Sequence, residues 1–474
     1  MTFRFSSEFS VSHDESVAFA HLSGDHNPLH VDPTTARRLR FGDTVAHGIH
    51  LFLRSFDELA AQRLFDHQAP TALFASFDNA VLTGAKVELD AQMEGRKLRI
   101  SAHVAGRRAF SGSIELGPLQ RSEVTIEDAE FSPACPEEVV FPPSPGDGAV
   151  PLKLSKHIFG TLFRSLNTVL GECWIADLLA TTQIVGMRCP GMHSIYSSFR
   201  LRRASLPGRI ASMRYRVTGV ETRLQMIRVQ VDGAYLEGTI ETFFRPPPVA
   251  QRSMNEVATL VSPSAFIGHR VLIVGGSRGL GELTAKIVAA GGAQVTLTYS
   301  RGREDAERIC IEARHLGRDC TARHLDITNP RLGSVCEWLA GSRFSHVYFF
   351  ASPLIAKNTG SWSEALFQQF TQIYVTAFAT LVEHLRPRRA DPIAPVRFLY
   401  PSSTFVNQVE SGFCEYAVAK AAGEALCDQL QDRNLQFKKP RLPRMRTDQT
   451  SSLVDIGAVD PLPVMLEVAC NMHS

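Results

Sequence analysis

RVLIVGGSRGLGE, residues 270–282, is the stretch that decides the fold of the second half of the chain. Four apolar residues in a row lead into a glycine-rich turn, and the turn leads into a helix. The glycines follow the spacing GxxxGxG, which lets a pyrophosphate group approach the backbone and lie at the amino terminus of the helix. From about residue 266 onward, short Val/Ile/Leu strands alternate with helices. This alternation predicts an α/β domain on a doubly wound parallel sheet with βαβ crossovers.

Three later segments carry side chains suited to chemistry on such a sheet. LDIT places Asp326 after an apolar strand, PSSTFV contains Ser403, and YAVAK contains Tyr416 and Lys420. With the glycine turn, these motifs resemble the short-chain dehydrogenase/reductase family, which has a Rossmann fold, over about residues 270–450. The resemblance implies that Tyr416 donates a proton to a ketone oxygen that Ser403 also binds. Lys420, four residues after the tyrosine, would lower the tyrosine pKa and hold the nicotinamide ribose.

The end of the second predicted strand indicates which nicotinamide cofactor is used. An enzyme that uses NAD usually has an acidic residue there, whereas this chain has Ser300 and Arg301. With Arg278 in the glycine turn, these residues favour the 2′-phosphate of NADP. The resemblance implies a cofactor site made of Gly275, Ser277, Arg278, Gly279, Gly281, Ser300, Arg301, Asp326, Ala351, Tyr416 and Lys420.

The second half also departs from the family pattern. Phe349 and Phe350 occupy the positions of the family's asparagine-rich turn, and Tyr374 aligns with the asparagine that supports proton relay to the lysine. Little sequence follows residue 450 to form a substrate lid. These departures predict a slow reductase, one specialised for a carrier-bound substrate, or a cofactor-binding scaffold.

The amino-terminal region carries a second motif, AHLSGDHNPLHVDPTTARRLRFGDTVAHGIHL, over residues 20–51. SGDxNPxHxD followed by a HG pair resembles the MaoC-type (R)-specific enoyl-thioester hydratases, which have a hot-dog fold. The resemblance implies that Asp25 and His30 are the catalytic pair and that Asn27 is an orienting side chain. It also implies that the backbone N–H of Gly48 faces the thioester oxygen.

The residue types suit that chemistry, because moving water across a Cα=Cβ bond needs one proton acceptor and one donor. The sequence does not say which of Asp25 and His30 plays which part. A backbone N–H at a helix start can stabilise the charge that develops on the thioester oxygen, by about 3 kcal/mol. The alternative is a simple turn at residues 25–28, with Asp32 or Thr34 capping the next helix. We expect His26, His47 and His50 to be ordinary packing or surface residues.

The middle of the chain repeats the order of the amino-terminal region, a long helix and then antiparallel strands, without DxNPxH. We therefore predict an α+β double hot-dog with a non-catalytic second half, in which His193 is structural. The predicted boundaries are a catalytic hot-dog at 1–118, a proline-rich linker at 119–150, the second hot-dog at 151–246, a linker at 247–265 and the reductase at 266–474.

Composition narrows the classes of partner. The 474 residues carry a formal net charge of +2, which gives no global field for nucleic acid or an anionic membrane. Nine cysteines without a CxxC pair favour reduced thiols over disulfides or zinc, so we expect no metal. There is no leader-like start and no uncharged apolar run of about 18 residues. We expect a cytoplasmic homodimer without nucleic-acid or membrane partners.

Both motifs suit consecutive steps on one acyl thioester, carried by CoA or by a carrier protein. Ketone reduction with NADPH makes a β-hydroxyacyl thioester, and dehydration then makes the enoyl thioester. The NADP preference favours biosynthesis of the fatty-acid or polyketide type. A hydratase/dehydrogenase of β-oxidation, or a dehydratase with a silent Rossmann module, are the alternatives, and GDxNPxH argues against a thioesterase.

Overall fold

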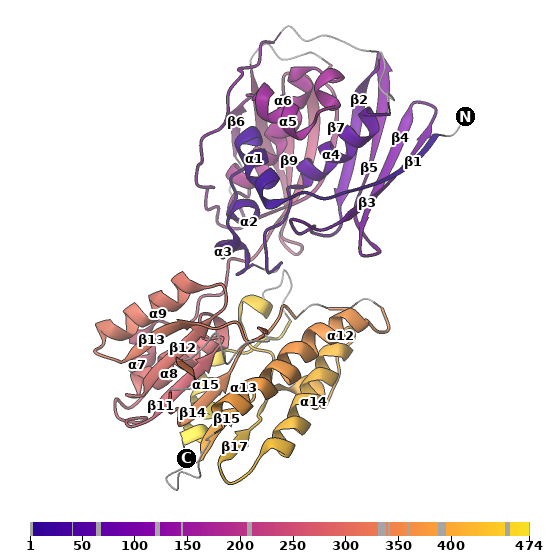
Figure 1. Cartoon of the computed structure of the whole chain (residues 1–474). Helices are drawn as coiled ribbons and strands as arrows, with labels where there is room; N and C mark the ends of the chain where they lie inside the picture. Colours follow the sequence, from indigo (N-terminus) through magenta and orange to yellow (C-terminus); the bar gives the residue numbers. More distant parts are fainter. Residues whose placement is uncertain are drawn as a thin grey trace. The chain divides into compact units, whose positions relative to one another are not determined.

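The computed structural model divides the chain into two compact units, one ending at Pro247 and one beginning at Pro248 (Figure 1), and each is described by itself. The structure describes residues 3–39, 41–62, 68–118, 124–143, 146–205, 211–329, 338–339, 342–355, 357–358, 360–386, 395–450 and 456–473.

A ten-stranded antiparallel sheet forms the frame of the amino-terminal unit. Its order is β1-β3-β4-β5-β2-β7-β10-β9-β8-β6, so the order of the first five strands returns in mirror image in the second five. The first five are β1 (Phe3–Phe9), β2 (Gln68–Phe77), β3 (Val87–Glu94), β4 (Lys97–Val104) and β5 (Arg107–Pro118). The others are β6 (Asp147–Pro151), β7 (Ser194–Arg203), β8 (Ser212–Glu221), β9 (Met226–Asp232) and β10 (Leu236–Phe244). Antiparallel pairing of β2 with β7 joins the halves, and β6 begins within the stretch predicted as a linker.

Each half packs a long helix on the sheet. α4 (Gly48–Ala60) buries an apolar stripe, and α6 (Glu172–Gln183) is buried almost all round. Phe52 of α4 packs edge-on against Phe199 of β7, with ring centroids 5.3 Å apart, and Phe56 stacks on Trp174 of α6 at 6.0 Å. Both helices therefore share one core. Shorter helices complete the layer: α1 (His13–Ser23), α2 (Pro28–Val31), α3 (Pro33–Ala36), α5 (Lys156–Leu162) and η1 (Leu166–Thr168).

A π-helical segment continues the long helix of the second half. The α-helical part of α6 ends at Gln183, and η2 (Ile184–Arg188) carries the helical run on until just before Pro190 and Gly191. A π-helix adds one residue to a turn and is frequently found at functional sites.

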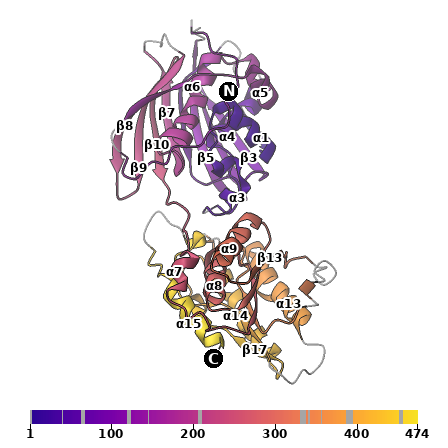
Figure 2. The same cartoon turned by 90° about the vertical axis from the view of Figure 1, so that its left-hand side faces the viewer.

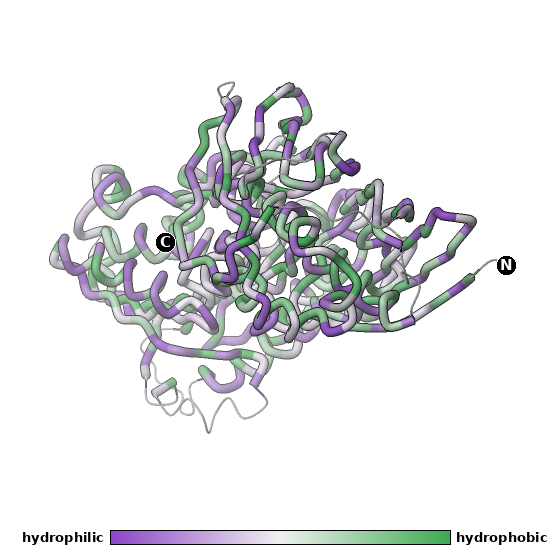
Figure 3. Tube along the Cα trace, turned by 90° about the horizontal axis from the view of Figure 1, so that it is seen from above, coloured by the Kyte–Doolittle hydropathy of each residue, from purple (hydrophilic) through white to green (hydrophobic). Residues whose placement is uncertain are grey.

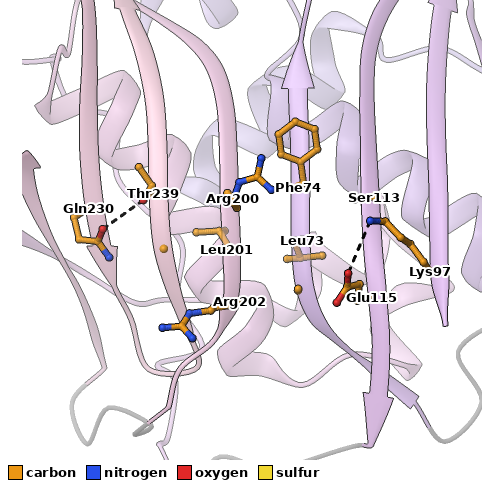
Figure 4. Close-up of a pocket in the computed structure, with 12 residues that line it drawn as sticks. Leu73, Phe74, Lys97, Ser113, Glu115, Arg200, Leu201, Arg202, Gln230 and Thr239 are labelled. Atoms are coloured by element: carbon orange, nitrogen blue, oxygen red, sulfur yellow. Dashed lines mark hydrogen bonds and ion pairs between the residues drawn. The ribbon is translucent and has the colours of Figure 1, made fainter. Parts of the chain in front are cut away.

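The face of the sheet away from these helices is polar. At the junction of the halves it holds an open groove of about 470 Å³ (Figure 4). Arg200 lies over the ring of Phe74 at 4.8 Å, and Lys97 pairs with Glu115 at 3.9 Å. Alternation along β7 places Arg200 outward while Phe199 faces the core.

The second unit is built on a six-stranded parallel sheet of order β13-β12-β11-β14-β15-β17. With the strands counted along the chain this order is 3-2-1-4-5-6, a doubly wound sheet, so the predicted Rossmann fold is confirmed. The strands are β11 (Arg270–Val274), β12 (Gln294–Tyr299), β13 (Cys320–His324), β14 (His346–Phe349), β15 (Val396–Leu399) and β17 (Leu435–Lys438). A small pair, β16 (Ser402–Ser403) and β18 (Arg441–Leu442), lies beyond β15.

Helices cover both faces of this sheet (Figure 2). One layer holds α7 (Met254–Ala258), α8 (Gly279–Ala290), α9 (Arg303–His315) and α15 (Pro461–His473). The other holds α12 (Glu364–Thr371), the π-helical η3 (Gln372–Ala377), α13 (Phe378–Leu385) and α14 (Cys414–Leu430). The last helix, α15, packs on α8. Two 3₁₀ turns, η4 (Thr404–Val406) and η5 (Asp448–Thr450), complete the unit.

Hydrophobic and hydrophilic residues alternate along most of the trace (Figure 3). Among the described residues, no helix has both the length and the apolar character needed to cross a membrane.

Candidate active sites

Two tight turns position the chemical groups of the amino-terminal motif. Gly24 ends α1 at a φ of 76°, in the left-handed region that glycine favours. Asn27 then caps α2, because its Oδ1 accepts a hydrogen bond from the N–H of Leu29 at 3.1 Å. As a result Asp25 and His30 lie close together. A carboxylate oxygen of Asp25 and a ring nitrogen each of His30 and His47 all lie within 4.8 Å of one another. Residues 25–28 therefore form a turn, and the same turn brings Asp25 and His30 together.

The Asp25 carboxylate is held by both halves of the unit. The residue is 1% exposed, and its Oδ2 accepts a hydrogen bond from Thr182 Oγ1 of α6 at 2.6 Å. Its Oδ1 accepts one from the backbone N–H of Asn27 at 3.2 Å. Gly186 of η2 lies against the same carboxylate, and a Cβ at that position would collide with it. The second half thus holds the Asp25 carboxylate in place, although it has no DxNPxH motif of its own.

His30 is fixed on its other side. Its Nδ1 lies 2.6 Å from the carbonyl oxygen of Val45, and a carbonyl can only accept, so Nδ1 carries the proton and Nε2 is left as acceptor in the neutral ring. The ring of His47 stacks on it with centroids 3.8 Å apart, while His47 Nε2 lies 3.0 Å from the carbonyl oxygen of Asp25. His47 therefore packs as predicted, and it packs on the site itself.

Burial pushes the two groups toward their neutral forms. Loss of water raises the pKa of the Asp25 carboxyl above its ordinary value and lowers the pKa of His30 below its own. Each group also pulls its partner toward the charged form by direct attraction. A carboxyl with a raised pKa beside an imidazole with a lowered one is a pair able to exchange protons with a substrate near neutral pH.

Asn27 and Gly48 occupy defined places around this pair. Asn27 Nδ2 donates to the carbonyls of Gly186 and Gly191, both at 3.1 Å, and so ties the motif to the second half. Gly48 opens α4, and the capping position His47 makes no side-chain hydrogen bond to the helix. A Cβ at Gly48 would come within 2.9 Å of the Phe77 ring, so this close packing requires glycine.

The remaining histidines lie around the site. His50 is buried and stacks on Phe19 at 4.5 Å, and His26 is buried with its ring edge-on to that of His21 at 5.2 Å. His193 packs edge-on against Phe244 at 5.5 Å, in keeping with a structural place.

Sequence reasoning missed Thr182, Gly186 and Arg245, all from the second half. The first two lie in an apolar helix whose pattern reads as core, and Arg245 stands at the start of a proline-rich stretch. No local motif marks them, because their place depends on the pairing of the halves.

In the second unit, two glycines of the turn at residues 275–281, Gly275 and Gly281, pack so closely on neighbouring backbone that a side chain would collide there. Gly275 has a φ of 78°, and a Cβ there would lie 2.7 Å from the backbone nitrogen of Ala351. Gly279 has a φ of 58° and opens α8, and a Cβ at Gly281 would collide with the Gly275 carbonyl. Ser277 is buried in the same turn. The open backbone and the amino terminus of α8 fit a pyrophosphate group.

Other predicted cofactor residues surround this turn. Arg278 is the capping position of α8, and Ser300 and Arg301 follow β12 directly. Asp326 lies after β13, where its Oδ1 accepts hydrogen bonds from the N–H and the hydroxyl of Thr328 at 3.0 and 2.7 Å. All lie beyond the carboxyl ends of the strands, the edge at which doubly wound sheets bind ligands.

The predicted catalytic residues of this unit also meet. Burial raises the pKa of the Tyr416 hydroxyl to about 12, and its hydrogen bond to Ser403 partly offsets that rise. Lys420 Nζ lies 5.8 Å from the Tyr416 ring centroid and donates to the carbonyl of Pro401 at 2.8 Å. Burial lowers the pKa of Lys420 to about 7. The serine, tyrosine and lysine thus form one cluster.

Tyr374 takes up the space beside the lysine. Its ring centroid is 3.8 Å from Lys420 Nζ, and its hydroxyl shares a 2.6 Å hydrogen bond with Ser352. Tyr374 belongs to the π-helical segment η3, and Phe349 is buried against Phe378 at 4.9 Å. Two of the three aromatic departures from the family pattern, Phe349 and Tyr374, are therefore packing residues, and Tyr374 covers the lysine.

Comparisons with known proteins match part of each unit to a protein family. Residues 1–109 match the model of the MaoC like domain, and residues 269–340 match that of the short chain dehydrogenases. Both resemblances are thereby confirmed. The chain joins a MaoC-like dehydratase domain at its amino-terminal end to a short-chain dehydrogenase domain further along.

Individual relatives match only parts of the chain. It is 34% identical over 92 residues to the peroxisomal hydratase-dehydrogenase-epimerase of Saccharomyces cerevisiae, which is 19% of this chain and 10% of the yeast protein. It is 27% identical over 171 residues to the short-chain dehydrogenase/reductase FrzI of Cladobotryum sp, 35% of this chain and 64% of that one. A short chain dehydrogenase from Burkholderia cenocepacia J2315 in complex with NADP has a TM-score of 0.38 at 22% identity, covering 43% and 90% of the two chains.

Proposed function

We propose that the amino-terminal unit adds water to, and removes water from, the Cα=Cβ bond of an acyl thioester. The observation that carries this proposal is the pair of buried Asp25 and half-buried His30, whose pKa values are shifted in opposite directions by loss of water. One group takes the Cα proton while the other protonates the departing β-hydroxyl, and the reverse reaction adds water. The N–H at Gly48 would stabilise charge on the thioester oxygen. We assign the fold as a double hot-dog over 1–118 and 151–246.

We propose that the unit at 266–474 reduces a β-ketoacyl thioester. The glycine turn has room for a dinucleotide, and Ser300, Arg301 and Arg278 suit NADPH, which would supply the hydride. The chain's own groups move the proton: Tyr416 gives its hydroxyl proton to the ketone oxygen, Ser403 binds that oxygen, and Lys420 promotes the transfer.

Together the two units would convert a β-ketoacyl thioester to an enoyl thioester. An NADPH preference favours this reductive direction and a cytoplasmic, biosynthetic role. The opposite direction, hydration followed by oxidation of the hydroxyacyl thioester, is the second candidate, and the printed name of the yeast relative favours it. Preference for NADH over NADPH would select the second.

Two assays test the proposal. Crotonyl thioester should lose the absorbance of its conjugated bond when the protein adds water, and acetoacetyl thioester should oxidise NADPH. Each is supplied on CoA and on a carrier protein. Absence of hydration refutes the first activity, and NADPH binding without reduction of any β-ketoacyl thioester leaves the second unit as a scaffold.

A further inference from the structure

A buried arginine lies beside the hydratase-type pair without a carboxylate partner. Arg245 directly follows β10 and is 6% exposed. Its backbone N–H donates to the carbonyl of His193 at 2.7 Å, and Nη2 donates to the carbonyl of Met192 at 2.5 Å. The other two guanidinium nitrogens, Nε and Nη1, are buried and have no hydrogen-bond partner in the part of the chain that the structure describes. Two of the three guanidinium nitrogens are therefore unused within the described residues.

The guanidinium is adjacent to the catalytic motif. The Met192 carbonyl that accepts from Arg245 also accepts from Asn27 Nδ2 at 3.3 Å, so the two donors meet on one oxygen. The charge on Arg245 is one of the effects that depress the pKa of His30. Arg245 therefore faces the same buried region as His30, from the second half of the unit.

An unpaired buried guanidinium is costly to keep. Removing a charged group from water without a partner costs several kcal/mol, and burial alone lowers the pKa of Arg245 to about 10. A ligand that brings a negative charge would remove this cost on binding. Guanidinium matches the planar oxygens of carboxylate and the oxygens of phosphate, with hydrogen bonds stronger than those between neutral groups.

We propose that Arg245 binds an oxyanion group of the thioester substrate. The group is a phosphate of the carrier arm or a carboxylate on the acyl chain, and its oxygens would accept hydrogen bonds from Nε and Nη1. This inference rests on the proposed hydratase function and adds a charged subsite to it. It makes the second half of the sheet part of the substrate-binding surface.

Equilibrium binding of saturated thioesters tests this subsite without turnover. The probes are butyryl-pantetheine, which has no charge, butyryl-4′-phosphopantetheine, which adds the phosphate, and glutaryl-pantetheine, which adds a carboxylate. Calorimetry on the full chain should show that one of the two anionic probes binds at least tenfold more tightly than the neutral one. The preferred probe identifies the source of the oxyanion.

Three variants locate the effect. Arg245→Met should erase the preference and Arg245→Lys should keep part of it, with unchanged circular dichroism. Arg200→Met is the matched control, because Arg200 lies on the outer face of the sheet (Figure 4) and should leave the preference intact. Thermal unfolding should show no loss of stability in Arg245→Met, since that variant removes an unpaired buried charge.

Equal binding of all three probes to the unmodified protein, no binding of any, or a preference that survives in Arg245→Met would overturn the inference. Hydration of crotonyl-CoA, measured in parallel, reports the proposed function separately. A protein that hydrates crotonyl-CoA and shows no anion preference would retain the function and lose the subsite.

Discussion

The two candidate active sites of this chain are built in different ways. In the amino-terminal unit, the proposed acid–base pair Asp25 and His30 comes from the first half of the unit, while Thr182 and Gly186 of the second half hold the Asp25 carboxylate in place. In the second unit, Tyr416 and Lys420 lie on one helix, α14, and aromatic side chains enclose the lysine. The first site is therefore an assembly across a duplicated fold, and the second is a local cluster on a sheet that a cofactor completes.

This difference predicts different sensitivities. A site assembled from two halves should respond to substitutions far from its motif in sequence, whereas a local cluster should respond to its own residues. Because each site has its own proton-transfer groups, damage to one should leave the other active.

The largest effect should come from the acid–base pair itself. Asp25→Asn or His30→Ala removes one proton carrier, so hydration of crotonyl thioester should fall by about 100-fold to 10,000-fold. The rate of NADPH oxidation with acetoacetyl thioester should stay within twofold, about the error of such assays. Retention of more than a few per cent of the hydratase rate in either variant would show that the pair is wrongly assigned.

The corresponding experiment on the second unit removes its proposed proton donor, the Tyr416 hydroxyl. Tyr416→Phe keeps the ring and its edge contacts with Phe370 and Tyr374, at 5.6 and 5.9 Å, and deletes only the hydroxyl. Ketone reduction should fall by about 100-fold or more, while NADPH affinity changes by no more than severalfold. Water can replace a missing relay asparagine but cannot replace the donor. A variant that matches the unmodified protein in rate would refute the reductase assignment.

A smaller effect tests the contribution of the second half. Thr182→Val deletes the hydroxyl that hydrogen-bonds Asp25, and that hydrogen bond lowers the carboxyl pKa against the effect of burial. Its loss raises the pKa further, so the carboxylate is protonated at a higher pH. The acidic limb of the hydratase pH profile should move upward, with a loss of about tenfold below it.

Thr181→Val is the control for that shift. Thr181 is the neighbouring buried threonine of α6, and its hydroxyl donates to the carbonyl of Leu178 at 2.7 Å. Its pH profile should match that of the unmodified protein. Identical shifts in both variants would mean that packing of α6, not the hydrogen bond to Asp25, sets the acidic limb.

The smallest effect concerns the cofactor. NADPH should bind at least about tenfold more tightly than NADH, a difference of about 1.4 kcal/mol, and Arg301→Asp should erase or reverse the preference. Fluorescence titration of both cofactors measures it directly. Equal affinity of the unmodified protein for NADPH and NADH would contradict the cofactor choice inferred from Ser300 and Arg301 after β12. It would also favour the oxidative direction.

Much of this architecture could be predicted from the sequence. The glycine spacing and the alternation after residue 266 follow from local rules, and the six-stranded parallel sheet is doubly wound as predicted. The predicted residues Asp25 and His30 meet, as do Ser403, Tyr416 and Lys420, because each set lies within one compact motif or at one edge of a sheet.

The unpredicted parts depend on contacts between distant segments. Thr182 touches Asp25 across 157 positions of sequence, and no periodicity in α6 distinguishes it from Thr181. The sequence indicated only that Asn27 is an orienting side chain. In the structure its amide donates a hydrogen bond to the backbone of the second half. Arg245 stands before a run of prolines at the predicted end of the second hot-dog, where no motif marks it, and it is buried. Such placements require the register of β7 and β10 to be known.

One product analysis tests the account of two consecutive steps most directly. Acetoacetyl thioester is incubated with NADPH and the unmodified protein, Asp25→Asn or Tyr416→Phe, and the acyl products are identified by mass. The unmodified protein should give a mixture of 3-hydroxybutyryl and crotonyl thioesters, Asp25→Asn should stop at 3-hydroxybutyryl, and Tyr416→Phe should leave acetoacetyl unchanged. Crotonyl thioester from Asp25→Asn, or no product from the unmodified protein, would contradict the account.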